Sequence, residues 1–236
     1  MCTVTFVNSK GKIILTSNRD EKVMRLSAIP PKNYIRKGKH LIFPKDSKAG
    51  GTWYVVDDEG TALVLLNGAS VKHEVKLPYR KSRGLIVLDI IEHKSPKDFW
   101  SVINLENIEP FTLVLYEKNK LFQLRWDGFQ KETIELNANE NHIWSSVTLY
   151  SEEIREKRAS WFASFLTGKD EISASEMLDF HRYTEKDNNE NGLVINRDNK
   201  LKTLSITQAV VEKNKVTLGY YDLIINLDYL TSFITI

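Results

Sequence analysis

The stretch MCTVTFVNSKGKIILTSNRDE (residues 1–21) contains two short runs in which apolar and polar side chains alternate. The runs occupy residues 3–8 and 12–17, and the turn-forming residues Ser9-Lys10-Gly11 separate them. Alternation on both sides of such a turn predicts a β-hairpin. The hairpin begins directly after Cys2, the one cysteine of the chain, so its geometry fixes which residues surround that cysteine.

Cys2 and the polar residues at the end of the second run form a candidate catalytic group. In an antiparallel hairpin that end lies beside the start of the first strand, so we expect Cys2 next to Asn18, Arg19 and Asp20. After removal of Met1, Cys2 would carry a thiol and a free α-amine, whose pKa of about 7.7–8.0 suits a general base. Asp20 can orient this amine, and Arg19 can hold the thiolate or an anionic substrate. The alternatives are a small buried cysteine and a polar turn with a surface ion pair.

Three later segments add candidate site residues. The paired glycines of the segment 50–53 let the backbone approach another backbone or a ligand closely, and Trp53 either lines a pocket or fills the core. Asn67 ends an apolar run, where its side-chain N–H can stabilise an oxyanion or belong to a turn. Ser145 and Ser146 either donate hydrogen bonds to a substrate carbonyl or cap the turn before a helix.

The rest of the chain predicts more hairpins and two groups of helices. Strand pairs are expected at residues 53–57 with 61–66, 111–117 with 120–126, 193–197 with 201–207, and 208–212 with 215–221. Helices are expected at residues 83–93, 96–104, 152–167 and 173–183, and Arg158 recurs with the apolar residues of the third helix. No linker interrupts residues 1–236, which favours a single domain. Strands and helices in this order predict an α+β fold, a four-layer α-β-β-α sandwich of two antiparallel sheets with helices outside.

Composition narrows the class of protein. Of 236 residues, 42% are apolar and 27% charged, an ordinary globular balance. The sequence has no multi-cysteine cage, no histidine pair at ligand spacing and no glycine-rich nucleotide motif, so we expect neither a metal nor a cofactor. No apolar run reaches the roughly 18 residues of a membrane span, and the N-terminus lacks the pattern of a signal peptide. We therefore expect a cytoplasmic protein without a transmembrane segment.

The charge distribution suggests the kind of ligand. Residues 1–50 contain eleven Lys or Arg and three acidic residues, although the whole chain has a net charge of only +2. This is either a solvated basic face or the mouth of a site for an anionic or amphipathic small molecule. Nucleic acid is not an expected partner, because no stripe of interleaved arginine and aromatic residues is present.

The motifs taken together resemble the NRDE family, also called Transport and Golgi Organisation proteins. The resemblance is carried by Met1-Cys2-Thr3, Asn18-Arg19-Asp20-Glu21, Gly50-Gly51-Thr52-Trp53, Asn67, Ser82-Arg83-Gly84 and Pro110-Phe111, in that order. That family is placed with penicillin V acylase and bile salt hydrolase among the N-terminal nucleophile (Ntn) hydrolases. The resemblance therefore implies the same four-layer sandwich.

The resemblance also implies roles for single residues. In the amidases the terminal cysteine attacks an amide carbonyl, so Cys2 would be the nucleophile. Asp20 would orient the terminal amine, Asn67 would serve the oxyanion and Arg19 would complete the catalytic group. Ser146 stands where the amidases use a second asparagine. A further arginine late in the chain has Arg155 and Arg197 as candidates, and the sequence does not choose between them. Substrate contacts are expected from Asn18, Glu21, Trp53, Ser145 and Ser146.

Two functions of different classes follow. The first is an N-terminal-cysteine hydrolase that cleaves a non-peptide C–N bond through a Cys2 thioester. The alternative is a non-enzymatic carrier of haem or acyl-CoA or another lipid on the same fold, because members of the family are linked to haem trafficking and lipid homeostasis. An interaction protein on an inactive hydrolase scaffold is a third possibility.

Overall fold

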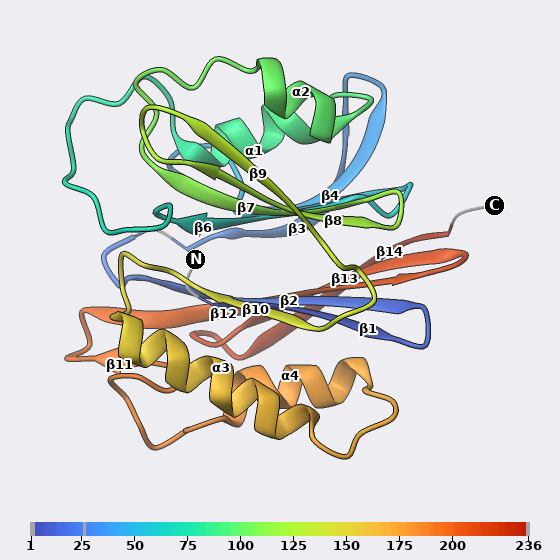
Figure 1. Cartoon of the computed structure of the whole chain (residues 1–236), viewed down its shortest axis with the longest axis vertical. Coiled ribbons are helices and arrows are strands. Elements are labelled where there is room, and N and C mark those ends of the chain that lie inside the picture. The colour runs from blue at the N-terminus through green and yellow to red at the C-terminus, as the bar shows by residue number, and fades with distance from the viewer. Residues whose placement is uncertain (1–2, 26, 235–236) are drawn as a thin grey trace.

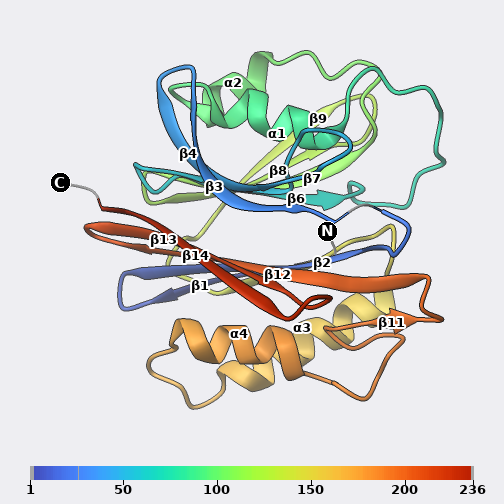
Figure 2. The same cartoon turned by 180° about the vertical axis from the view of Figure 1, so that it is seen from behind.

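The computed structural model describes residues 3–25 and 27–234 and has four layers (Figure 1). In this part of the chain two antiparallel sheets lie face to face, and helices cover the outer face of each. The view from behind shows the same order of layers (Figure 2). The α-β-β-α sandwich predicted from the order of elements is confirmed. No helix of the described residues is long and apolar enough to cross a membrane.

The first sheet contains the first and the last strand of the described residues. Its hydrogen-bonded order is β10 (His142–Ser145), β1 (Thr3–Ser9), β2 (Lys12–Lys22), β12 (Leu201–Glu212), β13 (Lys215–Asp222) and β14 (Leu227–Ile234), and β11 (Asn196–Arg197) pairs with β12. The predicted N-terminal hairpin is β1 and β2. The strands predicted at residues 201–207 and 208–212 are one strand, β12, and the strand predicted at 193–197 is limited to the two residues of β11.

The second sheet is built from consecutive strands. In both sequence and space they run β3 (Ile29–Arg36), β4 (Lys39–Lys45), β5 (Tyr54–Asp57), β6 (Ala62–Asn67), β7 (Phe111–Glu117), β8 (Lys120–Trp126) and β9 (Lys131–Leu136). Strands β5, β6, β7 and β8 are almost entirely buried, because helices cover one face and the first sheet covers the other.

The helices begin at residues suited to that position. The second sheet is covered by α1 (Arg83–Ile91) and α2 (Pro96–Val102), and the first by α3 (Glu152–Leu166) and α4 (Ala174–Tyr183). Pro96 occupies the first turn of α2, where its missing N–H costs nothing. Ser173 and Glu176 form the predicted capping box at the start of α4.

Tyr54 ties the two sheets together. Its side chain is fully buried, and its hydroxyl donates to the carbonyl of Leu15 at 2.7 Å. The same hydroxyl accepts from the backbone N–H of Ala209 at 3.1 Å. Leu15 on β2 and Ala209 on β12 oppose each other, so a side chain of the second sheet joins two neighbouring strands of the first. Burial raises the pKa of this phenol, which keeps it protonated as a donor.

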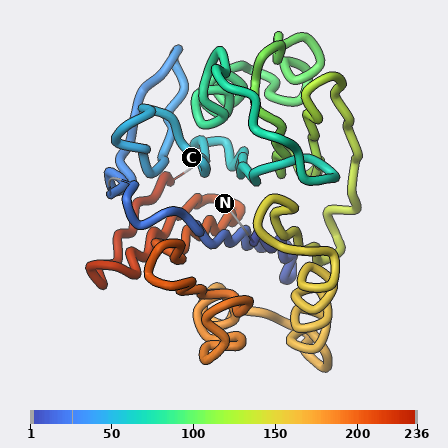
Figure 3. The backbone as a smooth tube through the Cα atoms, turned by 90° about the vertical axis from the view of Figure 1, so that its left-hand side faces the viewer, coloured from blue at the N-terminus to red at the C-terminus, as the bar shows by residue number. Residues whose placement is uncertain are grey.

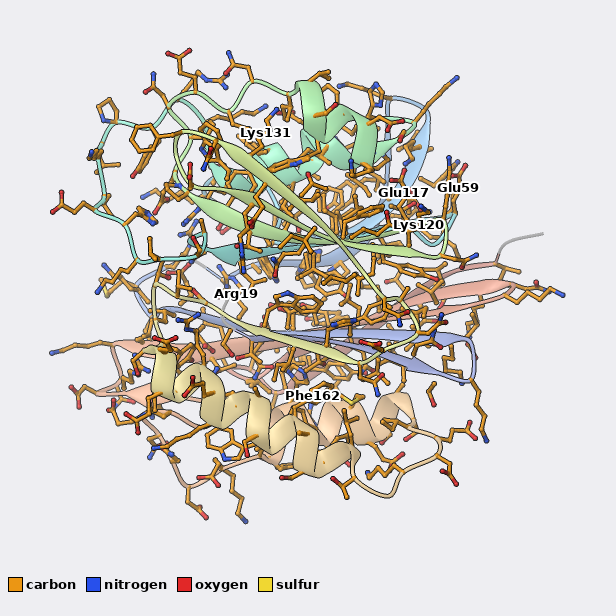
Figure 4. All side chains as sticks on the ribbon, viewed as in Figure 1. Arg19, Glu59, Glu117, Lys120, Lys131 and Phe162 are labelled. Atoms are coloured by element: carbon orange, nitrogen blue, oxygen red, sulfur yellow. The ribbon has the colours of Figure 1, made fainter. Side chains whose placement is uncertain are left out.

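Strand β2 sends alternate side chains to opposite faces of the first sheet. Ile13 and Leu15 belong to the core between the sheets, whereas Ile14 belongs to the cluster under the helices. The same alternation continues to the end of the strand. Arg19 therefore lies between the two sheets, where Figure 4 labels it, and Asn18 faces the layer of α3 and α4.

Candidate active site

Three strands meet at the start of the described chain. Thr3 on β1 is opposite Asn18 on β2 and, on its other side, opposite Ser145 on β10. The start of β1 therefore lies beside the polar end of β2, as the hairpin predicts. Cys2, the predicted nucleophile, lies outside the described residues.

The carboxylate of Asp20 is fixed by two hydroxyl groups. The hydroxyl of Tyr150 donates to Asp20 Oδ2, and that of Thr203 donates to Oδ1, each at 2.6 Å. The ring of Tyr150 in turn contacts two guanidinium groups, of Arg158 at 3.6 Å and of Arg197 at 5.3 Å from its centroid. Both oxygens of the buried carboxylate are thus held in a defined orientation, which a group that positions another charge requires.

Arg19 forms part of the wall of a cavity of about 510 Å³, called the first cavity here. Its guanidinium lies 4.2 Å from the centre of the Trp53 ring, and its Nη2 lies 3.8 Å from Asp46. Burial lowers the pKa of Arg19 below its usual value, but the group stays charged at neutral pH because the ordinary pKa of arginine lies far above 7. Glu21 also lines this cavity and accepts from Arg25 at 3.2 Å.

The close approach of two backbones forms another side of the first cavity. A Cβ on Gly51 would lie only 2.4 Å from the carbonyl carbon of Gly84, so the chain before β5 can touch the start of α1 only because Gly51 has no side chain. The N–H of Thr52 donates to the Gly84 carbonyl at 3.1 Å across this contact. Gly51 thus allows the close approach of two backbones that the sequence predicts for this glycine pair.

Asn67 lies where two cavities meet. It ends β6 and borders both the first cavity and a second cavity of about 290 Å³. Ser146 donates its hydroxyl to the backbone carbonyl of Asn67 at 2.8 Å. Gly68 follows with a φ of +83°, and a side chain there would collide with Val147. The segments after β6 and β10 therefore meet on one side of the molecule, which Figure 3 turns toward the viewer.

Six of the predicted site residues line the two cavities, whereas Asn18 and Asp20 line neither of them. Arg19, Glu21, Trp53 and Asn67 line the first cavity, and Asn67, Ser145 and Ser146 line the second. Asn18 was expected to contact substrate, but the structure buries it completely on the helix side of the first sheet. Its amide donates to the carbonyls of His181 and Leu193.

Two buried polar side chains that support the candidate site were not identified from the sequence. Arg158 of α3 is fully buried and donates to the hydroxyl of Thr3 and to the carbonyls of Asn191 and Gly192. His181 of α4 is fully buried as well, between Thr5 and Asn18. The signal for Arg158 was a charged residue at an apolar position of an amphipathic helix. Both residues contact β1 or β2 from the layer of α3 and α4.

His181 is neutral in the folded protein. Because Asn18 uses its amide N–H groups elsewhere, its Oδ1 must accept from His181 Nδ1, and His181 Nε2 then accepts from the Thr5 hydroxyl. In this arrangement the ring carries one proton, on Nδ1. Burial, with the nearby charge of Arg158, lowers the pKa of His181 from 6.5 to about 3.

We expect this histidine to make the folded protein sensitive to acid. The unfolded chain gains a proton at His181 near pH 6.5, but the folded chain gains it only near pH 3. His181 therefore lowers the free energy of unfolding by about 1.4 kcal/mol per pH unit as the pH falls through this window. Urea denaturation at several pH values measures this change. As the pH falls, the free energy of unfolding should decrease less steeply for His181→Gln than for the wild type. Replacing the exposed His93 by glutamine should leave the slope unchanged, and an equal slope in all three proteins would contradict the assignment.

No cluster of three His, Cys, Asp or Glu residues within the described ranges is arranged to bind a metal ion. The chemical groups around the cavities are instead guanidinium, carboxylate, amide and hydroxyl groups. They can bind a polar ligand, stabilise a developing negative charge and orient an amine.

The fold has known counterparts. The Caenorhabditis elegans ortholog of N-acylethanolamine-hydrolyzing acid amidase matches with a TM-score of 0.62 and 13% identity, over 88% of this chain and 92% of that chain. Two mutants of the conjugated bile acid hydrolase from Clostridium perfringens match with TM-scores of 0.63 and 0.64 and identities of 11% and 9%, each over 98% of this chain and 92% of that chain. The protein therefore has an Ntn-hydrolase-like fold.

The sequence itself defines the family. The model of the family Transport and Golgi organisation 2 (TANGO2) matches residues 1–222, and the chain belongs to this family. The resemblance stated from the motifs is thereby confirmed. No curated protein matches the chain.

Proposed function

We propose that the protein is an N-terminal-cysteine amidohydrolase that cleaves a non-peptide C–N bond of a small anionic or amphipathic amide. One observation carries the proposal. Arg19 on the first sheet and Asn67 on the second line the same cavity, at the end of the sandwich where Thr3 meets Asn18. Cys2 directly precedes Thr3 in the sequence.

The reaction uses groups that the chain supplies itself. After removal of Met1, the Cys2 sulfur adds to the amide carbonyl, and the α-amine accepts the thiol proton. The side-chain N–H of Asn67 stabilises the oxyanion of the tetrahedral intermediate. The C–N bond then breaks, and the α-ammonium returns the proton to the leaving amine. Water hydrolyses the thioester, releasing the acid and regenerating the thiol.

Asp20 has the role of orienting the α-ammonium in this proposal. The hydroxyl groups of Tyr150 and Thr203 each donate to one oxygen of its carboxylate. Because those hydroxyl groups fix the carboxylate, the amine it holds would be fixed as well.

The charges of the first cavity favour the hydrolase over a carrier of haem or acyl-CoA. A carrier would need cations free to bind propionates or phosphates. Arg25 instead pairs with Glu21 at 3.2 Å and with Asp46 at 2.8 Å, and Arg83 pairs with Glu109 at 3.0 Å. These pairs leave little positive charge to neutralise a strongly anionic ligand.

The proposal is tested by intact-mass spectrometry of the protein incubated with a series of acyl amides of 7-amino-4-methylcoumarin, from acetyl to decanoyl. The expected result is a chain that lacks Met1 and gains one acyl group, which peptide mapping assigns to Cys2. Fluorescence of the released amine should accompany the adduct. Retention of Met1 would exclude the α-amine as base and overturn the proposal, and so would haemin binding with a Soret shift but no acylation by any amide.

A further inference from the structure

The second cavity differs from the first in its charge. It lies between the end of β6, the strand β10 and the helix α3. Arg125 and Arg155 are the charged residues among its described lining, and no carboxylate lines it with them. The first cavity, in contrast, has acidic partners for its cations. An electrostatic potential of one sign in a partly enclosed space attracts an anion.

Hydrogen-bond donors in the second cavity lack partners within the described part of the chain. The Nε atoms of Arg125 and Arg155 and the hydroxyl oxygen of Ser145 are buried without a hydrogen bond. The one ion pair recorded for Arg125 uses Nη1, which contacts the half-exposed Glu132 at 3.0 Å. A buried donor without a partner destabilises the folded protein. Several such donors around one cavity indicate a ligand that accepts from them.

The position of Asn67 relates this anion site to the reaction. Among the described residues it alone lines both cavities, and it is the proposed oxyanion donor. A scissile amide held at Asn67 would therefore extend one half into each cavity. The first cavity offers apolar surface from Trp53, Leu65 and Leu77. The second offers two guanidinium groups, which match the geometry of a carboxylate.

We infer that the second cavity is a subsite for a carboxylate carried by the amine half of the substrate, and that Arg155 is its main determinant. This inference rests on the proposed function, because that function places the scissile amide at Asn67. The substrate class is then an acyl amide of an amino acid, with the apolar acyl chain in the first cavity. Arg155 is the better test residue, because the structure records no ion pair for it within the described ranges, whereas Arg125 pairs with Glu132.

Binding is measured by calorimetry in the Cys2→Ala variant, which holds a ligand without turnover. N-decanoylglycine and the uncharged decanoyl ethanolamide serve as ligands of equal acyl length. We expect tighter binding of the carboxylate, and Arg155→Gln should weaken it by about ten- to 150-fold, the range of one charged hydrogen-bonded contact. Binding of the ethanolamide should change less than about twofold. Arg155→Lys should restore part of the affinity for the carboxylate.

Lys157→Gln is the matched control, because it removes one positive charge from an exposed position of the same helix. It should leave the affinity for both ligands unchanged. Equal affinity for the two ligands, or an equal loss for both in Arg155→Gln, would overturn the inference. Because this readout is binding, carboxylate selectivity in a protein that hydrolyses no amide would refute the proposed function while the anion site stands.

Discussion

Replacing Cys2 by alanine is expected to abolish amide hydrolysis while ligand binding is largely retained. The thiol is the proposed nucleophile, and removal of a nucleophile lowers kcat by about 10⁴-fold or more in enzymes of comparable logic. Cys2→Ser keeps the α-amine but offers a hydroxyl that is far less acidic than a thiol. The kcat of this variant should therefore lie between those of Cys2→Ala and the wild type. The measurement is kcat and KM on the amide that acylates the wild type fastest.

The control for this experiment is Lys157→Gln, which is remote in function from the proposed nucleophile and should retain wild-type kcat. Calorimetry with the same ligands shows whether Cys2→Ala keeps its binding site. An unchanged kcat in Cys2→Ala would refute the cysteine mechanism. Loss of binding together with kcat would instead point to a structural role for Cys2 and would refute its assignment as nucleophile alone.

Arg158→Met is expected to lower the free energy of unfolding by about 3 kcal/mol. Methionine fills most of the volume, but the hydroxyl of Thr3 and the carbonyls of Asn191 and Gly192 lose their donor. Each buried group left without a partner costs about 1–3 kcal/mol. The contact of the guanidinium with the Tyr150 ring, 3.6 Å from its centroid, is lost as well.

Urea denaturation with a constant m-value measures this change. Arg158→Lys keeps the charge but loses the planar guanidinium group. The free energy of unfolding of this variant should therefore lie between those of Arg158→Met and the wild type. The neighbouring Lys157 is exposed, and Lys157→Met should change stability by less than about 0.5 kcal/mol. A loss below about 1 kcal/mol in Arg158→Met would show that the buried guanidinium is dispensable.

The local pattern of apolar and polar residues was sufficient to predict the helices and strands that are buried and regular. The N-terminal hairpin, the strand pairs around residues 53–66 and 111–126 and all four helices are present near their predicted positions. Strands β3, β4, β9 and β14 were not predicted. Three of them are edge strands, and much of each is exposed, so apolar residues do not alternate with polar ones along them. Pro30 and Pro31 make β3 harder still to predict, because proline is disfavoured in the interior of a strand.

The candidate site was predictable where it depends on the hairpin register and not where it depends on packing between layers. The register brings Asn18 opposite Thr3, as the hairpin requires. The sequence did not show that Asn18, and not Arg19, would face the helices, because this depends on which face of the sheet the helices cover. Arg158 and His181 reach the first sheet from helices far along the chain. Only tertiary packing makes such contacts.

The hydroxyl of Tyr54, inserted between opposing strands of the other sheet, holds the two sheets at a fixed spacing beside the first cavity. Tyr54 follows Trp53 directly, and its partner Leu15 lies on the same strand as Arg19. The two walls of the first cavity are therefore locked in register before any ligand arrives. A site assembled in advance loses little entropy on binding but adapts poorly to shape. We accordingly expect sharp discrimination between acyl chains of different length, with an optimum set by the fixed distance between the sheets.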